Sequence, residues 1–387
     1  MLDDDLIDTH HEIDIQFFSN LPIDLVRLVF EKAMEDKPTP LHLLRVSHQV
    51  RQWLEPIVYK HVALYTDHDF DRFYRTLCER RSTPNPHEST FLQRHVQTLF
   101  LCPDFPGTDR LIDLVQHLTQ LRSLACWDGD VIQWGRTAMG AVLDTTFNPH
   151  TQVDDMNIPF PYPHLRRISF CASVLSERHI SFTHRAFHNL THMDILVHPT
   201  VDWETLRSLN NLTHVSLDMA TDLPCLGTKE IQFWFTRLLS ACPSTVKIII
   251  LAIVEDCNSD FDLRDSEGDY FYPGWPPPPS FQETFSSPWL SAKFTHSTTI
   301  DLTTLHPIAQ LSLGLIDPRA VPAAVTFNIP KYQLFKDLVV YFNWPDNRLD
   351  WDGSVGGHKD CWEVAEAIVD RRKRGLVTWG ELVKAMM

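Results

Sequence analysis

The chain has 387 residues, of which 43% are hydrophobic, 11% aromatic and 22% charged. This composition excludes an intrinsically disordered protein. The length exceeds what a single compact core usually reaches, so we expect two to three domains or one long repetitive body. The net charge of −16 argues against binding to nucleic acid, which depends on Lys and Arg side chains that displace counterions.

Residues 1–17 form an acidic N-terminal tail that begins MLDDDLIDTHHEID. This tail lacks the basic start and apolar stretch of a secretory signal. The longest aliphatic run, 248–254, has seven residues, whereas a membrane-spanning helix needs about 20. We therefore expect no membrane association and a location in the cytoplasm or nucleus.

Motifs that would carry chemistry are few. The eight cysteines contain no CxxC pair, the 20 histidines contain no HExxH pattern, and there is no GxSxG or Gly-rich phosphate loop. Residues 256–267 have the acidic spacing of an EF-hand, but Phe261 stands where the loop requires Gly. Histidines such as His192 and His214 are expected to be surface or hydrogen-bonded strand residues. We expect no metal, no cofactor and no enzymatic activity, with an undetected hydrolase as a remote alternative.

The first predicted helix, SNLPIDLVRLVFEKAM at 19–34, is apolar around most of its circumference. Pro22 suits its first turn, because the missing N–H would have no partner there. At 100° per residue, the charged residues Asp24, Arg27 and Glu31 share an arc of about 60°. A helix on one core needs an apolar stripe of roughly 100°, and this helix has about twice that. Either the helix is enclosed in its own domain, or one stripe binds a partner.

Further helices follow the first one. Pro38 and Pro40 separate it from residues 41–57, whose apolar side chains recur at spacings of three and four. That spacing predicts one or two short helices that end near Pro56. After them, the alternation around residues 62–64 predicts that a strand begins the next region.

A loose repeat runs through the middle of the chain. Short segments place apolar residues at positions n, n+3 and n+5, and their starts are 22 to 44 residues apart. The best examples are Val96/Leu99/Leu101, Leu165/Ile168/Phe170, Leu190/Met193/Ile195 and Leu212/Val215/Leu217. The shorter spacings are typical of leucine-rich repeats. Amphipathic stretches lie between the segments, so we expect parallel strands joined by right-handed helical crossovers.

The alternation predicts a mixed α/β fold in which an irregular solenoid with parallel strands spans residues 66–345. A doubly wound α/β sheet is the alternative, because the repeat period is irregular. Late strands are expected in TTIDL, AQLSLGLI and KDLVVYFNW. Residues 346–387 are expected to form a helical segment that caps the open end of the solenoid, and the basic run at 371–374 suits a helix C-terminus.

An insertion at 255–289 interrupts the predicted solenoid with an acidic half and a half rich in proline and aromatic residues. Long loops in compact domains are usually functional or disordered. Its aromatic side chains are candidates for binding a target protein, and folding back onto the solenoid is the alternative. These candidates are Tyr270, Tyr272, Trp275 and Trp289.

Residues 18–65 resemble the F-box-like domains that begin many fungal proteins with degenerate leucine-rich repeats. The resemblance rests on Leu21-Pro22 opening a helix, on the helix core IDLVRLVFEKA, and on the segment LLRVSHQVRQWLEPIVYKHVAL. It implies a substrate receptor of a cullin-RING ubiquitin ligase, in which the F-box binds a Skp-type adaptor and the repeats hold an unknown target protein. The alternative is a leucine-rich-repeat-like interaction scaffold that never joins a ligase.

The resemblance also implies an adaptor surface on the N-terminal helices. Its residues, carried over by position, are Leu21, Pro22, Leu25, Val29 and Val46. The sequence departs from the family four residues after the last of these, where the usual tryptophan is Val50 and a tryptophan, Trp53, follows one turn later.

The two apolar sides of the first helix are expected to have different roles. Three residues are expected to face the partner: Leu21, Pro22 and Leu25. Three are expected to face the protein's own core: Val26, Phe30 and Ala33. Val29 lies between the two sets and is not assigned to either.

Overall fold

A computed structural model of the chain describes its residues in the following ranges: 21–35, 41–101, 108–126, 162–171, 180–183, 187–196, 201–219, 236–254, 314–326, 340–343 and 359–376. The chain divides into two compact units, Met1–Tyr59 and Lys60–Met387. We call them the N-terminal unit and the C-terminal unit, and each is described by itself.

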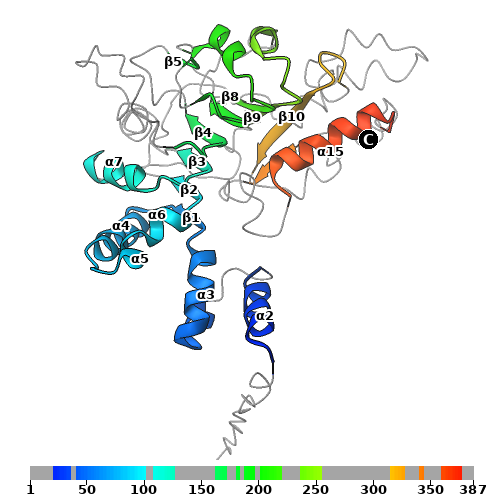
Figure 1. Ribbon diagram of the computed structural model, residues 1–387. Helices are drawn as coiled ribbons and strands as arrows, with labels where there is room; N and C mark the ends of the chain where they lie inside the picture. The colour runs from blue at the N-terminus through cyan, green and yellow to red at the C-terminus, as the bar shows by residue number, and fades with distance from the viewer. Residues whose placement is uncertain are drawn as a thin grey trace, which may run out of the picture. The chain divides into compact units, whose positions relative to one another are not determined.

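The N-terminal unit consists of short helices (Figure 1). They are α2 (Ile23–Glu35), the 3₁₀ helix η1 (Leu41–Arg45) and α3 (His48–Val58). The Ser47 hydroxyl caps α3 by accepting a hydrogen bond from the Val50 N–H at 3.1 Å. The helices after residue 40 are as predicted, except that α3 continues through Pro56 to its end at Val58.

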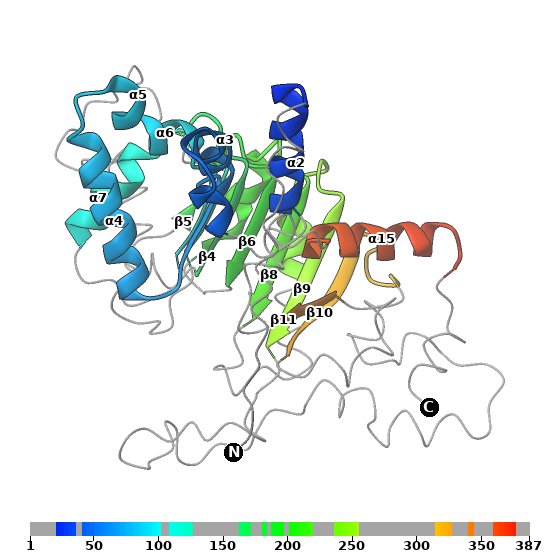
Figure 2. The same cartoon turned by 90° about the horizontal axis from the view of Figure 1, so that it is seen from below.

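The C-terminal unit contains a nine-stranded sheet in which every neighbouring pair is parallel. In spatial order its strands are β1 (His61–Leu64), β2 (Thr98–Leu101), β3 (Ser123–Cys126), β4 (Arg167–Cys171), β6 (His192–Leu196), β8 (His214–Met219), β9 (Ile248–Val254), β10 (Ala320–Thr326) and β11 (Val340–Asn343). This order is also the order along the chain (Figures 1 and 2). A doubly wound sheet reverses its strand order at a switch point, so the described strands do not have that alternative arrangement.

The boundary between the units falls earlier than residue 65, where the sequence placed it. β1 pairs with β2 over its whole length, from His61 opposite Thr98 to Leu64 opposite Leu101. The strand therefore belongs to the sheet, and the N-terminal unit ends at Tyr59.

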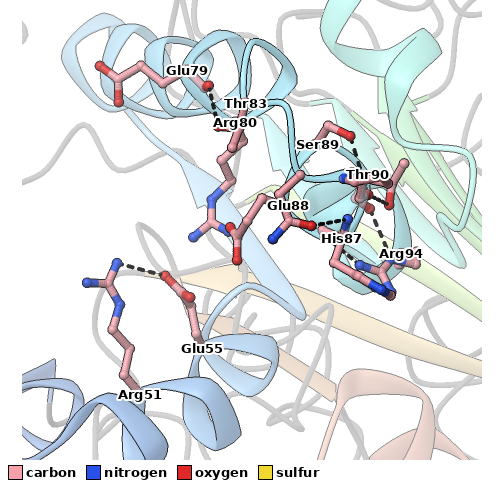
Figure 3. Close-up of polar contacts among 12 residues, drawn as sticks. Arg51, Glu55, Glu79, Arg80, Thr83, His87, Glu88, Ser89, Thr90 and Arg94 are labelled. Atoms are coloured by element: carbon pink, nitrogen blue, oxygen red, sulfur yellow. Dashed lines mark hydrogen bonds and ion pairs between the residues drawn. The ribbon is translucent and has the colours of Figure 1, made fainter.

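Helices and short segments connect the strands. They are α4 (Asp67–Arg81), α5 (Pro86–Ser89), α6 (Phe91–His95), α7 (Thr108–His117), the 3₁₀ helix η4 (Trp203–Ser208), helical residues 236–241, and a small parallel pair of β5 (Ile180–Ser181) with β7 (Val201–Asp202). A capping box between Thr66 and Asp69 starts α4. An ion pair of 2.8 Å between Arg80 and Glu88 links the C-terminal end of α4 to α5 (Figure 3).

The repeat seen in the sequence has a direct counterpart in the backbone. The residue after each repeat start donates its N–H to the carbonyl of the equivalent residue one repeat earlier: Arg122 to Gln97, Arg166 to Arg122, Thr191 to Arg166, Thr213 to Thr191 and Lys247 to Thr213. These bonds are 2.7 to 2.9 Å long. Each repeat is therefore aligned on its predecessor before its strand begins.

One side of the sheet, which we call the crossover face, carries the predicted apolar pattern. All twelve side chains of the four best repeat examples are buried, with 2% exposure or less. Connecting segments cover this face. Phe170 of β4 contacts Phe187, the Phe187 ring lies 5.5 Å from Phe182, and Phe182 lies 6.2 Å from Trp203 of η4. This side of the sheet forms the first core of the unit.

The opposite side of the sheet, which we call the α15 face, is covered by helix α15 (Cys361–Lys373) (Figure 2). Trp362, Ala365, Ile368 and Val369 of this helix pack in one buried cluster with strand residues. The strand members of the cluster are Phe100, Ala125, Ile248, Ile250, Ala252, Val321 and Ala323. The expected cap at 346–387 thus contains a helix, but that helix lies on a face of the sheet.

The later strands were predicted only in part. β11 falls within KDLVVYFNW, as predicted, whereas Gly314–Leu315 of AQLSLGLI lie in a turn and TTIDL lies outside the described residues. β10 was missed because Pro322 lies within it. Proline donates no ladder hydrogen bond and argues against a central strand. Pairing with β11 begins only at Ala323, so position 322 precedes that ladder.

Candidate functional site

The α2 helix buries one of its sides within the N-terminal unit. Val26 and Met34 are buried, and Phe30 packs against the cluster of Met34, Val50 and Leu54. At 100° per residue, Val26, Phe30 and Met34 lie within about 80° of one another. This side of α2 therefore faces α3.

A second apolar stripe of α2 is exposed. Leu25 is 48% exposed, Leu28 58% and Val29 49%. These residues have the spacing i, i+3, i+4, which places them on one side of a helix within about 100° of each other, centred opposite the buried side. We call Leu25, Leu28 and Val29 the α2 stripe. It is an apolar helix face of the width that a partner groove covers.

The structure allows the exposure of the first-helix residues to be compared with the prediction, whereas contact with a partner stays a prediction. Pro22 and Leu25 are exposed, Leu21 is half-buried, and Val26 and Phe30 face α3. The expectation for Ala33 is wrong, because it is exposed and Met34 takes the inward position beside α3. Val29, which the sequence left unassigned, belongs to the exposed side.

The predicted residue after η1 is also accessible. Val46 is 57% exposed and directly precedes the Ser47 cap of α3. Val50, which stands where the resembled family has a tryptophan, is buried in the core of the unit, and Trp53 packs partly against the same core. This core position of α3 therefore contributes to folding of the unit and not to its surface.

Three further exposed apolar residues were not among the predicted adaptor residues: Ile23, Leu28 and Leu41. The sequence already indicated that Leu28 shares a side of the helix with the predicted residues, because it lies three residues after Leu25 and one before Val29. Six of the eight exposed large apolar side chains in the described ranges belong to the short N-terminal unit. Such a concentration marks an interaction surface more strongly than a single exposed leucine does.

Charged groups on the same helices are paired within each helix. Arg27 donates to Glu31 at 2.6 Å on α2, and Arg51 donates to Glu55 at 3.2 Å on α3 (Figure 3). Both pairs have i, i+4 spacing, which stabilises a helix by a few tenths of a kcal/mol. On the charged side of α2, next to its apolar stripe, Arg27 and Glu31 therefore neutralise each other.

The candidates for binding a target protein lie outside the described residues. This holds for Tyr270, Tyr272, Trp275 and Trp289 and for the whole insertion at 255–289. In the described part of the C-terminal unit, the most prominent polar contact between distant segments is an ion pair of 2.9 Å between Arg167 of β4 and Asp360. Asp360 also caps α15, so the pair fixes the start of that helix against the sheet.

Two further kinds of site, metal sites and membrane-spanning helices, concern the described residues only. Among them, no group of three or more His, Cys, Asp or Glu side chains is placed to hold a metal ion. Within the same ranges, no helix combines the length and apolar character needed to cross a bilayer. In the comparisons with known proteins, no protein-family model, no curated protein and no solved structure matches the chain.

Proposed function

We propose that this protein is a substrate receptor of a cullin-RING ubiquitin ligase, with its N-terminal unit binding a Skp-type adaptor. The observation that carries the proposal is the α2 stripe. The helix already packs on α3 through Val26 and Met34, yet a separate apolar stripe of Leu25, Leu28 and Val29 stays in solvent. The resemblance of residues 18–65 to F-box-like domains supplies the class of partner for this stripe.

The size of the stripe is compatible with a moderate contribution to binding. Full burial of an aliphatic side chain is worth roughly 1.5–3 kcal/mol. Since the three residues are about half exposed, covering them contributes roughly 2–4 kcal/mol in total before the entropic cost of association. Pro22 and Val46 are exposed as well and would extend the contact.

We propose further that the C-terminal unit is a degenerate leucine-rich-repeat solenoid that holds the target. The strands follow chain order, and equivalent positions make equivalent contacts in successive repeats. Asn211 donates to the carbonyl of His188 at 2.9 Å, and Asn189, its equivalent one repeat earlier, donates to the carbonyl of Pro163 at 3.5 Å. The aromatic residues of the 255–289 insertion remain the candidates for contacting the target.

Co-purification of the full chain with a Skp-type adaptor tests the proposal. The double variant Leu25→Asp/Leu28→Asp should lose the adaptor, because two charges would enter an apolar contact. Leu376→Asp is the matched control and should retain the adaptor, because Leu376 is 51% exposed but belongs to the C-terminal unit. Failure of the wild-type chain to bind any Skp-type adaptor would overturn the proposal.

One observation keeps the interaction scaffold as a second candidate. Val50 occupies the place of the family's usual tryptophan and is buried in the N-terminal unit. A scaffold without a ligase would bring down target proteins from a cell extract but neither adaptor nor cullin. The same co-purification, analysed by mass spectrometry, therefore separates the two functions.

A further inference from the structure

Two histidines stack on each other where the sheet meets α15. His192 begins β6 and His214 begins β8, and they are direct neighbours in the register of the two strands. Their rings lie 4.2 Å apart and are nearly parallel, with 6° between their planes. Stacked rings this close cannot both carry a proton without direct repulsion of like charges.

A threonine precedes each histidine and sets its hydrogen bonding. The hydroxyl of Thr213 lies 2.8 Å from Nδ1 of His214, and Thr191 has the same relation to His192. The carbonyl of Thr191 already accepts two backbone N–H groups, from Thr213 and His214. The Thr213 hydroxyl also donates to this carbonyl at 3.0 Å, so its oxygen is left to accept a hydrogen bond from Nδ1 of His214.

Nε2 of His214 points to α15. It lies 3.0 Å from Oε1 of Glu366 and donates to this carboxylate when it carries a proton. Trp362, also on α15, presents its ring edge-on to both imidazoles, 5.4 Å from His192 and 5.6 Å from His214. The Trp362 side chain is buried. The histidine pair thus forms part of the surface on which α15 packs.

The charged groups around the pair come from two strands and from the helix. Arg167 of β4 is next to His192 in the sheet register and is paired with Asp360 at the start of α15. Glu366 is the other acidic group that contacts the pair. Asp194 lies two residues after His192 on the same side of β6, is buried and accepts a hydrogen bond from Ser169. Protonation of both imidazoles would therefore add positive charge beside Arg167, with the carboxylates of Asp360, Glu366 and Asp194 nearby.

We propose that the His192–His214 pair makes the attachment of α15 to the sheet sensitive to pH, so that protonation of the pair releases the helix. In the attached state both rings pack against Trp362, and burial disfavours a proton on either of them. When they are protonated, the attached state holds two like charges in a stack, whereas the released state exposes them to water. Acidification therefore shifts the equilibrium toward release.

The direction of the pKa shifts agrees with this geometry. Burial, together with the nearby His214 and Arg167, lowers the pKa of His192 to about 2. Burial also lowers the pKa of His214, although the hydrogen bond and charge of Glu366 oppose the shift. A histidine in water has a pKa of about 6.5. The attachment is therefore strongest above that value and weakens as the pH falls below it.

The expected size of the effect follows from proton linkage. A histidine that stays neutral in the attached state and titrates normally in the released state raises the release equilibrium about tenfold between about pH 7.5 and about pH 5.5. His192 alone gives this factor. If His214 also stayed neutral in the attached state and titrated normally in the released state, the release equilibrium would rise about 100-fold. Glu366 opposes the lowering of the His214 pKa, so the expected rise lies between about 10-fold and about 100-fold.

Hydrogen exchange of the full chain measures the release. After correction for the intrinsic pH dependence of exchange, protection factors of the α15 amides should fall by between about 10-fold and about 100-fold over that pH range, while those of α4 stay constant. The double variant His192→Phe/His214→Phe keeps two aromatic rings but no titrating group, and its α15 protection should no longer depend on pH. His68→Phe, at an exposed histidine of α4, is the matched control and should behave as the wild type.

Two results would overturn the proposal. One is an α15 protection factor in the wild type that does not change between about pH 7.5 and about pH 5.5. The other is a pH dependence that persists in the double phenylalanine variant. Should that variant fail to fold, histidine-selective carbon labelling of the wild type replaces it. The His192 signal should stay at its neutral position well below about pH 6.5, and titration of His192 near the ordinary histidine value would refute the proposal.

Discussion

Substituting the two sides of α2 separately should affect two different properties of the protein. Val26→Ala removes two methyl groups from a buried position, whereas Leu28→Ala removes three carbons from a side chain that is 58% exposed. At about 0.8 kcal/mol for each buried carbon plus a cavity contribution, Val26→Ala should destabilise the N-terminal unit by about 2 kcal/mol. Leu28→Ala should change its stability by less than about 0.5 kcal/mol.

The effect on adaptor binding should be reversed. If the partner covers the exposed part of Leu28, Leu28→Ala loses about 1.4 kcal/mol of binding free energy, which is about tenfold in the dissociation constant. Val26→Ala leaves the α2 stripe in place, so its affinity should stay within about twofold of wild type.

Two measurements on the full chain check this pair of outcomes. Hydrogen exchange of the α2 and α3 amides gives the opening free energy of the N-terminal unit, and titration with the purified Skp-type adaptor gives the affinity. Arg27→Ala is the control on the charged side of the same helix, and the loss of its exposed pair with Glu31 should cost less than about 0.5 kcal/mol. A destabilisation above about 1 kcal/mol by Leu28→Ala would refute the assignment of the two sides.

Substitutions at three further positions test other contacts of the structure. Ser47→Ala removes the side-chain cap of α3 and should destabilise the N-terminal unit by about 1 kcal/mol, measured by exchange of the α3 amides. Trp362→Ala should cost about 3–5 kcal/mol in the protection of α15, and Trp362→Phe clearly less, since the aromatic ring against the histidines remains. Asp113→Asn removes a carboxylate whose pKa is lowered. Burial opposes this shift, but the hydrogen bonds from Arg81 and Tyr74 together with the charge of Arg81 outweigh it. A carboxyl group with a lowered pKa stabilises the folded state at pH values above its ordinary pKa of about 4, and this stabilisation is lost as the pH falls through the folded-state pKa. The wild type should therefore have a higher thermal unfolding temperature than the variant at neutral pH, and the difference should disappear in acid.

The repeat could be predicted from the sequence because each strand contributes its own local pattern. Residues n+3 and n+5 lie on the same side of an extended strand, and Ile168 and Phe170 are buried together accordingly. Residue n, here Leu165, is buried just before the strand begins. The mixed α/β class and the parallel strands follow from the same alternation of strand and helix. β10 escaped prediction because Pro322 is a strong local signal that the surrounding sheet overrides.

The position of α15 could not be predicted, for a different reason. Its apolar residues Trp362, Ala365 and Ile368 show that one side of the helix is covered, but the pattern is the same for a helix at the end of a solenoid and for a helix on its sheet. The contacts that decide between the two join residues far apart in the sequence. Local periodicity contains no information about such pairs.

In the α2 helix, too, part of the arrangement follows from local periodicity and part depends on tertiary contacts. Exposure of Leu25 and burial of Val26 and Phe30 follow from the helical wheel together with the position of the charged side. Which apolar stripe faces α3 depends on tertiary contacts, and this is why Ala33 was placed on the wrong side and Leu28 was overlooked. Val29 could not be assigned from the wheel because it lies at the margin of both stripes.

The ion pair between Arg167 and Asp360 joins residues that are 193 positions apart. During synthesis on the ribosome, β4 through β10 are therefore complete well before the helix that covers them has been made. Until residue 361 emerges, Ile248, Ile250 and Val321 present an uncovered apolar sheet surface to the surrounding proteins. A chain that ends before α15 keeps that surface. Chaperones that recognise exposed apolar strands would therefore bind such a chain more than one that contains the helix.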